Sequence, residues 1–201
     1  MFFYWKGVQQ MEQTENQPTR LFIDMDGVLA KFNPIASEEE LYEPGYFINL
    51  DPMPEVVNGI RQHIAETPSA EVYVLSAYLS DSDYALEEKQ RWLDEYLPEI
   101  DQEHRIFCPC GEPKAQYIAH GVGRTDILID DYTKNLLEWQ NAGGKGIKLL
   151  NGINHTRGTW QGEFLNAETF GNDFRQKMNE LKIQKAEPQL TQKPPQKGRA
   201  R

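Results

Sequence analysis

Two aspartates separated by one residue, Asp24 and Asp26, follow an apolar run and are followed by Gly27. An apolar run that ends in polar residues and glycine is typical of a buried strand that leads into a loop. Residues two apart in an extended chain point to the same side, so both carboxylates would face one site. Like charges held together need a compensating cation or a proton. Carboxylate oxygens favour a hard divalent cation, and we expect Mg²⁺.

Two further predicted strands also end in polar side chains. Ser76 follows Val-Tyr-Val-Leu, and Asp130 with Asp131 follows Ile-Leu-Ile. Taken alone, Ser76 is an ordinary strand-end hydroxyl, and the aspartate pair could cap a following helix. Lys114, taken alone, is an ordinary solvated helix residue. In a parallel sheet, however, sites lie outside the carboxyl ends of the strands, so we expect these ends to line one edge with Asp24.

The elements that must position these side chains alternate along the chain. Strands that alternate with helices predict right-handed crossovers and a parallel α/β sheet that is covered on both faces. Strands are expected at residues 20–24, 71–76, 105–108, 126–131 and 146–150. Helices are expected at 54–66, 83–96, 112–119, 133–141 and 167–182, with a short Ser-capped helical start at 37–40 and a loop at 151–160.

Composition excludes several classes of function. The 201-residue chain is long enough to bury its own core as one domain. No apolar run approaches the length of a membrane span, so no membrane partner is expected. The net charge of −10 argues against a surface that binds a nucleic-acid polymer. A small anionic substrate would depend on local cations, because the overall field opposes it.

Cys108 and Cys110 are the two cysteines of the chain. They are too few for a disulfide framework, so a reducing cytoplasm is the expected location. A zinc site that combines them with His104 and His120 is an alternative use of these side chains. The Cys-x-Cys spacing is unusual for zinc and does not favour that alternative.

The two ends of the chain differ in composition from the middle. Residues 1–18 become polar after a short aromatic start, and we expect a disordered leader. Residues 184–201 are rich in Gln, Lys and Pro, and we expect a disordered tail. From residue 182 onward, six basic residues and one acid give a charge of +5, so residues 1–181 carry −15. The folded domain is expected at 19–183.

The ordered set of motifs resembles the haloacid-dehalogenase-like (HAD) phosphatase superfamily across roughly residues 20–160. The matching motifs are Asp24-x-Asp26-Gly27, Ser76, Lys114 and Asp130-Asp131. Three stretches are similar more narrowly to the 5'(3')-deoxyribonucleotidase family, including its bacterial and phage-type members: 24–30 with Phe32, 46–54 and 128–131. The resemblance implies a HAD-like (Rossmannoid) five-stranded parallel sheet flanked by helices, with a small cap inserted at about 33–53.

The resemblance also implies a role for each acidic residue. A carboxylate that attacks a phosphate monoester splits one hard step into two through an aspartyl-phosphate. Asp24 is implied as this nucleophile, and Asp26 as the general acid that later serves as the base. Mg²⁺ is implied to bind the side chains of Asp24 and Asp130 and the backbone carbonyl of Asp26. Asp131 is implied to act through water or by holding a metal ligand.

Phosphate binding is implied for three residues that carry donors. The Ser76 hydroxyl and the backbone N–H of Ala77 would hold phosphate oxygens. Lys114 would neutralise the phosphate and the charge that develops in the transition state.

The predicted cap is rich in aromatic side chains. Phe32, Tyr46 and Phe47 occupy places where, by resemblance, their faces could stack on a nucleobase. The alternative is that these three side chains and Tyr42 form a small core of the cap.

The implied activity is that of a phosphoric monoester hydrolase of the 5'-nucleotidase type. It would be Mg²⁺-dependent and would act on (deoxy)nucleoside monophosphates. One alternative is the same chemistry on another small phosphate ester, such as a sugar phosphate. Another is a catalytically idle HAD-like domain used for binding, and the intact Asp24, Asp26, Lys114 and Asp130 argue against it.

Overall fold

The computed structural model describes residues 19–33, 36–154 and 158–186. The predicted leader at 1–18 lies outside the described residues, as does the predicted tail from residue 187 onward. Helix α6 (Phe170–Ala186) extends into the segment that was expected to be disordered from residue 184, so that boundary was placed too early. Among the described residues, no helix combines the length and the apolar character needed to cross a bilayer.

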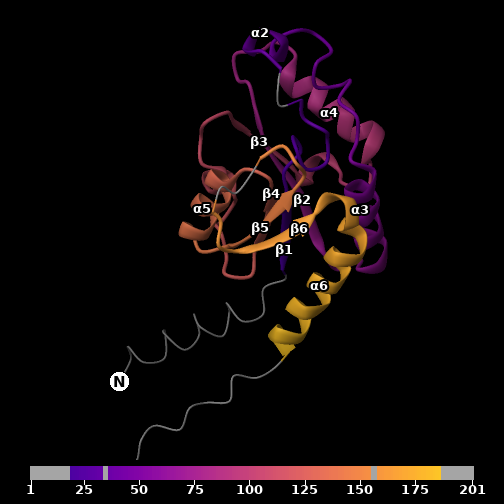
Figure 1. Ribbon diagram of the computed structural model, residues 1–201, viewed down its shortest axis with the longest axis vertical. Helices are drawn as coiled ribbons and strands as arrows, with labels where there is room; N and C mark the ends of the chain where they lie inside the picture. The colour runs from indigo at the N-terminus through magenta and orange to yellow at the C-terminus, as the bar shows by residue number, and fades with distance from the viewer. Residues whose placement is uncertain (1–18, 34–35, 155–157, 187–201) are drawn as a thin grey trace, which may run out of the picture.

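The described chain is organised around a parallel sheet of six strands in the order β3-β2-β1-β4-β5-β6 (Figure 1). The order reverses at β1, because the chain first adds strands on one side of it and then crosses to the other. Such a reversal opens a crevice at the carboxyl ends of the strands. The strands are β1 (Arg20–Ile23), β2 (Glu71–Tyr78), β3 (Arg105–Pro109), β4 (Ile127–Asp130), β5 (Lys145–Leu150) and β6 (Glu163–Asn166).

The expected α/β class is confirmed, but the strand count of five was wrong. The additional strand, β6, pairs in parallel with β5, and Leu165 lies opposite Leu149. Leu165 is the one buried residue among the four of β6, and its neighbour Phe164 is 62 % exposed. An edge strand with a single buried residue lacks the alternation that predicts a strand.

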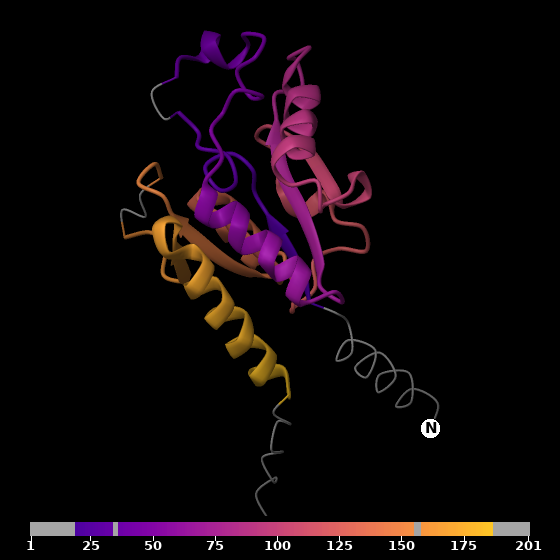
Figure 2. The same ribbon diagram turned by 90° about the vertical axis from the view of Figure 1, so that its right-hand side faces the viewer.

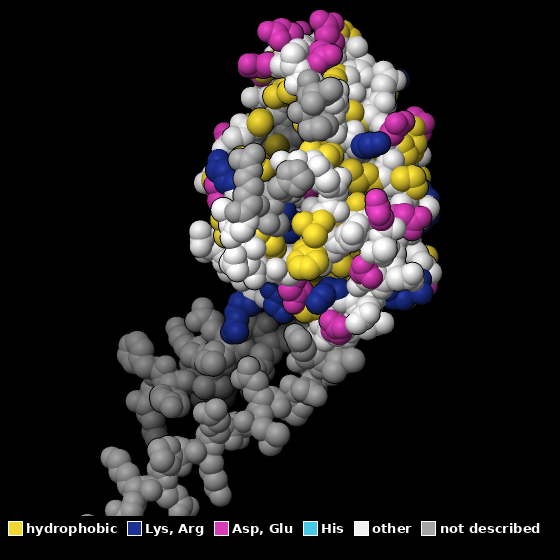
Figure 3. Space-filling view, in the orientation of Figure 1, with side chains coloured by type: hydrophobic (Ala, Val, Ile, Leu, Met, Phe, Trp, Pro, Cys, Tyr) yellow, Lys and Arg dark blue, Asp and Glu magenta, His cyan; other side chains and the backbone are white. Residues whose placement is uncertain are grey.

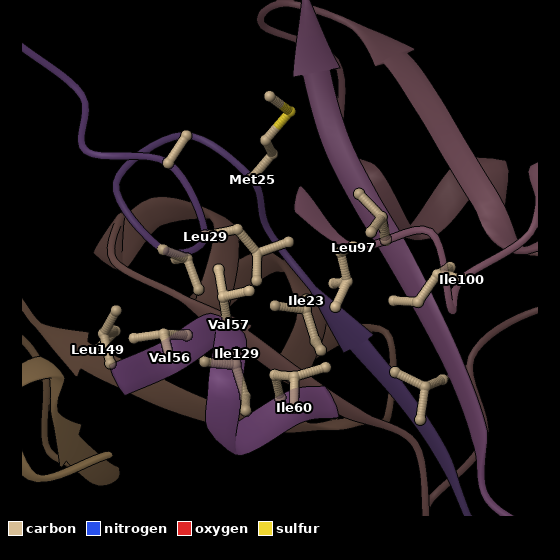
Figure 4. Packing of buried hydrophobic residues seen from close by; sticks show 14 of the residues in the cluster. Ile23, Met25, Leu29, Val56, Val57, Ile60, Leu97, Ile100, Ile129 and Leu149 are labelled. Carbon is tan, nitrogen blue, oxygen red and sulfur yellow. The ribbon is translucent and has the colours of Figure 1, made fainter. Parts of the chain in front are cut away.

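One face of the sheet is covered by α3 (Pro54–Glu66), α4 (Ala85–Tyr96) and α6. Figure 2 shows α3 and α6 lying side by side across the sheet. The apolar side chains of α3 recur on one side of the helix, as predicted, and they bury against the strands. Figure 4 shows this packing for residues of α3 and three strands: Ile23, Val57, Ile60, Ile129 and Leu149.

The opposite face is covered by α5 (Thr133–Asn141) and the short 3₁₀ helix η2 (Lys114–Tyr117). Trp139 of α5 packs edge-on against Phe22 of β1, with their ring centroids 5.1 Å apart. The structure has only the short 3₁₀ helix η2 where a helix was predicted at 112–119. Pro113 caps that turn from the position before it, where its missing N–H removes no hydrogen bond of the helix.

The segment between β1 and α3 contains the predicted cap, and we refer to its described residues 36–53 as the insert. Its short helix α2 (Glu38–Leu41) is capped by Ser37, whose hydroxyl accepts the backbone N–H of Glu40. In Figure 1, α2 lies at the same end of the molecule as α4. Trp92 of α4 donates from its ring nitrogen to the carbonyl of Leu50 at 2.7 Å, which ties the insert to the main body. Figure 3 shows acidic side chains gathered around α2.

Candidate active site

Three buried carboxylates converge where β1 and β4 end. Asp130 is the last residue of β4, Asp131 follows it, and Asp24 follows β1. The backbone N–H of Asp24 donates to the carbonyl of Ile129 at 2.9 Å, so the pairing of the two strands continues to the site. One oxygen from each carboxylate lies within 4.8 Å of the others. The predicted convergence of residues 24 and 130 is therefore present in the fold.

Gly27 makes the turn that brings the loop after β1 against Asp131. Its φ is +76°, in the left-handed region that glycine adopts without steric cost. A Cβ atom at this position would lie 2.3 Å from Asp131 Oδ2, which is closer than real atoms approach. The backbone N–H of Gly27 donates to the carbonyl of Ala30 at 2.8 Å and closes the loop. Gly27, which was predicted to allow a sharp turn, thus also allows the backbone to lie close to the Asp131 side chain.

Lys114 is the cation at the centre of the carboxylates and is only 3 % exposed. Its Nζ lies 2.9 Å from Asp24 Oδ1 and 2.7 Å from Asp130 Oδ2. Burial opposes the charged ammonium, but the charges of Asp130 and Asp24 outweigh burial and raise the pKa of Lys114 above its ordinary value. Lys114 therefore stays charged and lies between the carboxylates of Asp24 and Asp130.

Backbone and amide donors fix the orientation of the Asp130 carboxylate. Its Oδ1 accepts the backbone N–H of Tyr132 at 2.8 Å, and its Oδ2 accepts the side-chain amide of Asn135 at 2.9 Å. Tyr132 and Asn135 begin the helix that follows β4, so the start of α5 holds the carboxylate in one orientation.

Asp131 is held by residues that sequence reasoning did not assign. The side-chain amides of Asn151 and Asn154 both donate to its Oδ2 at 2.8 Å. The buried Lys148 donates to the backbone carbonyl of Asp131 and, at 3.0 Å, to the hydroxyl of Thr133. Burial, together with the charge of the adjacent Asp130, raises the pKa of Asp131 to about 7.

Asp26 lies next to the three carboxylates and is paired with Lys89 of α4. Its Oδ2 forms an ion pair with Lys89 Nζ, and its Oδ1 is buried with no hydrogen-bond partner among the described residues. Burial raises the pKa of Asp26 above its ordinary value, while the charge of Lys89 opposes this shift. A carboxyl group whose protonated form is favoured by burial is suited to donate a proton.

Ser76 lies at the same edge of the sheet, but it does not end a strand. Strand β2 continues two residues past it to Tyr78, because Ser76 and Ala77 pair with Phe107 and Cys108 of β3. Ser76 is fully buried, and its hydroxyl lies 3.4 Å from the carbonyl of Ala77. The prediction that the strand stops at Ser76 was therefore wrong. The predicted edge is the right one, because Ile23 pairs with Val74, so Asp24 and Ser76 both lie just beyond this pair.

The aromatic side chains proposed for base binding form one cluster with unequal exposure. The Tyr46 ring meets the rings of Phe32 and Phe47 edge-on, with centroid distances of 6.1 Å and 5.0 Å. Phe47 is 4 % exposed and belongs to the main core, whereas Phe32 and Tyr46 are partly exposed. Tyr42 lies outside these ring contacts, and its hydroxyl donates to Asp81 at 2.9 Å.

The donor set favours magnesium over zinc. Among the described histidines, cysteines and acids, the group that converges closely enough to hold an ion is Asp24, Asp130 and Asp131. The alternative set of His104, Cys108, Cys110 and His120 does not form such a group in the described chain. Carboxylate oxygens are the ligands of hard cations such as Mg²⁺, whereas zinc sites favour nitrogen and sulfur.

The fold is similar to those of solved HAD-type phosphatases. A D,D-heptose 1,7-bisphosphate phosphatase from B. bronchiseptica, crystallised with magnesium and phosphate, aligns with 79 % of this chain and 99 % of its own at a TM-score of 0.58 and 12 % identity. The corresponding phosphatase from Burkholderia thailandensis aligns with 78 % of this chain and 98 % of its own at a TM-score of 0.53 and 10 % identity. At such low identity, these likenesses show the fold alone.

A family model described as "5' nucleotidase, deoxy (Pyrimidine), cytosolic type C protein" matches residues 37–163, more than half of the chain. The chain belongs to this family. The part that matches this type C 5'-nucleotidase family includes Ser76, Lys114 and the Asp130-Asp131 pair, and it begins after the Asp24–Gly27 turn. The resemblance inferred from the motifs is thus confirmed.

Bacterial relatives agree with membership of the type C 5'-nucleotidase family. A protein of Staphylococcus epidermidis, provisionally named 5'(3')-deoxyribonucleotidase, is 34 % identical over 95 residues, which are 46 % of this chain and 41 % of the relative. A Staphylococcus aureus protein with the same provisional name is 32 % identical over 101 residues, 49 % of this chain and 47 % of the relative. The aligned segment therefore spans less than half the length of either relative.

Proposed function

We propose that this chain is a Mg²⁺-dependent phosphomonoesterase that dephosphorylates (deoxy)nucleoside monophosphates through an aspartyl-phosphate on Asp24. The observation that carries the proposal is the position of Lys114, 2.9 Å from Asp24 Oδ1 and 2.7 Å from Asp130 Oδ2. A buried cation between two carboxylates provides a nucleophile and a charge that can hold phosphate within one small volume.

The surroundings of Asp24 suit a nucleophile with one anchored oxygen. Its Oδ1 accepts the backbone N–H of Met25 at 2.8 Å and also contacts Lys114. We assign the other oxygen, Oδ2, to the attack on phosphorus. Because the carboxylate is held in place before substrate arrives, little reorganisation is needed as the new bond forms.

Asp26 supplies and then removes a proton. As an Asp24 oxygen bonds to phosphorus, the bond from phosphorus to the leaving oxygen breaks, and its electron pair stays on that oxygen. The proton of the Asp26 carboxyl moves to the leaving oxygen, so a neutral alcohol departs. In the second step, the Asp26 carboxylate takes a proton from water as this water attacks the aspartyl-phosphate, which releases phosphate and regenerates Asp24.

The chain offers suitable ligands for the ion and donors for the phosphate. The Asp24 and Asp130 side chains and the Asp26 carbonyl would hold Mg²⁺, and Asp131 would act beside them or through water. When bound, the ion would neutralise charge on the phosphate oxygens. Lys114 would contact the same phosphate together with the Ser76 hydroxyl and the N–H of the adjacent residue, Ala77.

The proposed nucleotide specificity rests on the family description and on two aromatic residues, Phe32 before the insert and Tyr46 within it. Phe32 and Tyr46 keep part of their surface exposed, so these rings, rather than the buried Phe47, could contact a base. The family description names a deoxy-pyrimidine 5'-nucleotidase, which supports a nucleotide over a sugar phosphate. The two free cysteines and the word "cytosolic" in that description support a cytoplasmic location.

Phosphate release from a panel of nucleoside monophosphates and sugar phosphates, with Mg²⁺ and with EDTA, tests the proposal. We expect Mg²⁺-dependent release from nucleotides and at least about a 10³-fold loss in Asp24→Asn, because the nucleophile is removed. Asp83→Asn, at an exposed position, is the matched control and should retain wild-type activity. A strong preference for a sugar phosphate would overturn the substrate class, and no release from any ester would leave the chain as an idle binding domain.

A further inference from the structure

Helix α4 carries two adjacent charged residues that are both buried, Glu88 at 7 % exposure and Lys89 at 0 %. Buried charges are retained only where they are paired, and each of these is paired with a different part of the chain. Neighbouring positions on a helix point about 100° apart, so one turn of α4 can serve two partners. Glu88 contacts the insert, and Lys89 contacts the loop after β1.

The contacts of Glu88 hold the backbone of the insert. Its carboxylate accepts the N–H groups of Gly45 at 2.5 Å, Phe47 at 3.0 Å and Ile48 at 3.4 Å. Backbone donors converge on a carboxylate in this way when it anchors a loop. The backbone of the insert is therefore held to α4 at Glu88, the residue directly before Lys89.

The contacts of Lys89 hold one oxygen of Asp26 and leave the other without a partner. Lys89 Nζ pairs with Asp26 Oδ2 and lies 4.6 Å from the centroid of the Phe47 ring. Asp26 Oδ1 is buried and accepts no hydrogen bond from the described residues. A buried oxygen without a partner is uncommon in a folded protein and indicates that a group outside the chain completes it.

We propose that Lys89 is a positioning residue that orients the Asp26 carboxyl, so that Oδ1 faces the leaving oxygen of the substrate. This inference rests on the proposed function, because it assigns to Asp26 the transfer of a proton to that oxygen. Lys89 itself touches neither the phosphate nor the leaving group in this account. It acts through Asp26 alone, and its neighbour Glu88 keeps the Phe47 ring against it.

The proposal predicts that the effect of Lys89 depends on the leaving group. When a nucleoside departs, the leaving oxygen is strongly basic and must take the Asp26 proton as its bond to phosphorus breaks. When p-nitrophenolate departs, the electron pair is delocalised into the ring, and no proton is needed. A misplaced Asp26 should therefore slow nucleotide hydrolysis much more than p-nitrophenyl phosphate hydrolysis.

The experiment measures kcat on both substrates for Lys89→Met, Lys89→Arg and a matched control. We expect Lys89→Met to lower kcat on a nucleoside monophosphate by about 10²-fold or more and on p-nitrophenyl phosphate by less than about 10-fold. Lys89→Arg, which keeps the charge, should recover part of the nucleotide rate. Arg91→Met, on the exposed side of the same helix, should match wild type on both substrates.

A double variant keeps the test decisive if Lys89→Met does not fold. Asp26→Asn combined with Lys89→Met leaves neither charge unpaired, so it should fold where the single Lys89 variant does not. If Lys89 acts through Asp26, the double variant should have the same nucleotide rate as Asp26→Asn alone. A further loss in the double variant would overturn the inference.

The possible failures are distinguishable. A wild-type protein that hydrolyses neither ester would overturn the proposed function, and the inference with it. A wild-type protein active on both esters, with equal losses on both in Lys89→Met, would overturn the positioning role and leave the proposed function standing.

Discussion

The side-chain amide of Asn151 donates to Asp131 Oδ2 at 2.8 Å and ties the loop after β5 to the carboxylate that follows β4. The same amide also contacts the backbone carbonyl of Gly27 in the loop after β1. Three loops therefore meet at one side chain, although nothing in the sequence assigned a role to Asn151. Its effect can be measured against that of Asn154, which donates to the same carboxylate oxygen.

We predict that Asn151→Ala destabilises the protein more than Asn154→Ala does. The first change removes the amide donor to the Gly27 carbonyl and one donor to Asp131, and it also removes the side-chain oxygen that accepts the backbone N–H of Ile153 at 2.8 Å. The second change removes a donor to Asp131. Each lost hydrogen bond is worth about 1 kcal/mol, so the difference should be about 2 kcal/mol. Urea unfolding of both variants measures it, and a larger loss in Asn154→Ala would contradict the prediction.

Gly27→Ala should abolish activity and lower stability by about 2–4 kcal/mol, because strain in the left-handed region adds to a contact with Asp131. Gly121→Ala is the matched control, since Gly121 has a φ of +78° and no atom within 4 Å of its Cβ position. That control should lose only about 1 kcal/mol and stay active. Equal effects at both positions would show that the close approach to Asp131 is unimportant.

The metal-free protein should lose stability as the pH rises from 5 to 7.5. Asp131 has a folded pKa of about 7 and an ordinary value of 3.8, so across this range the folded state binds more protons than the unfolded state. The free energy of unfolding should therefore fall by roughly 2 kcal/mol. Denaturant unfolding in EDTA at several pH values measures this change.

Asp131→Asn should flatten that pH dependence, whereas the exposed Asp83→Asn should leave it unchanged. Addition of Mg²⁺ at pH 7.5 should restore stability to the wild type, because an ion that binds only the folded state stabilises it. A stability that rises between pH 5 and 7.5 in EDTA would contradict the assigned origin of the shift.

Phe32→Ala should affect substrate binding, whereas Phe47→Ala should affect the stability of the fold. Phe32 is partly exposed, so its loss should raise KM for a nucleoside monophosphate several-fold and leave KM for a sugar phosphate unchanged. Phe47 is buried in the core, so its loss should lower the free energy of unfolding by about 3 kcal/mol or more. Steady-state kinetics on both esters and thermal unfolding separate the two outcomes; an unchanged nucleotide KM in Phe32→Ala would exclude stacking there.

The central strands could be predicted because each is a continuous apolar run buried on both faces, as in Leu21-Phe22-Ile23 and Ile127-Leu128-Ile129. The same runs end in Asp24 and Asp130, so the position of both carboxylates followed from the topology of a parallel sheet. Strand β6 could not be predicted in this way, because only Leu165 is buried in it.

The residues that support the site through hydrogen bonds and ion pairs were harder to predict than the carboxylates at its centre. Glu88 and Lys89 belong to the run Glu87-Glu88-Lys89-Gln90, which has the composition of a solvated helix surface. Both are buried by parts of the chain far away in sequence: Glu88 by the backbone of the insert, about 40 positions earlier, and Lys89 by Asp26 and the Phe47 ring. Lys148 is similar, since the acceptors that satisfy its buried ammonium, the Asp131 carbonyl and the Thr133 hydroxyl, lie in the segment that follows β4.

The place of β1 in the middle of the sheet bears on how the protein is made. Its two partners lie far along the chain, and the second of them begins only at Ile127. During synthesis, the first strand must wait for more than a hundred later residues to leave the ribosome before its second edge is covered. A nascent chain truncated before β4 would therefore leave one edge of β1 unpaired and would lack Asp130 and Asp131 of the candidate site.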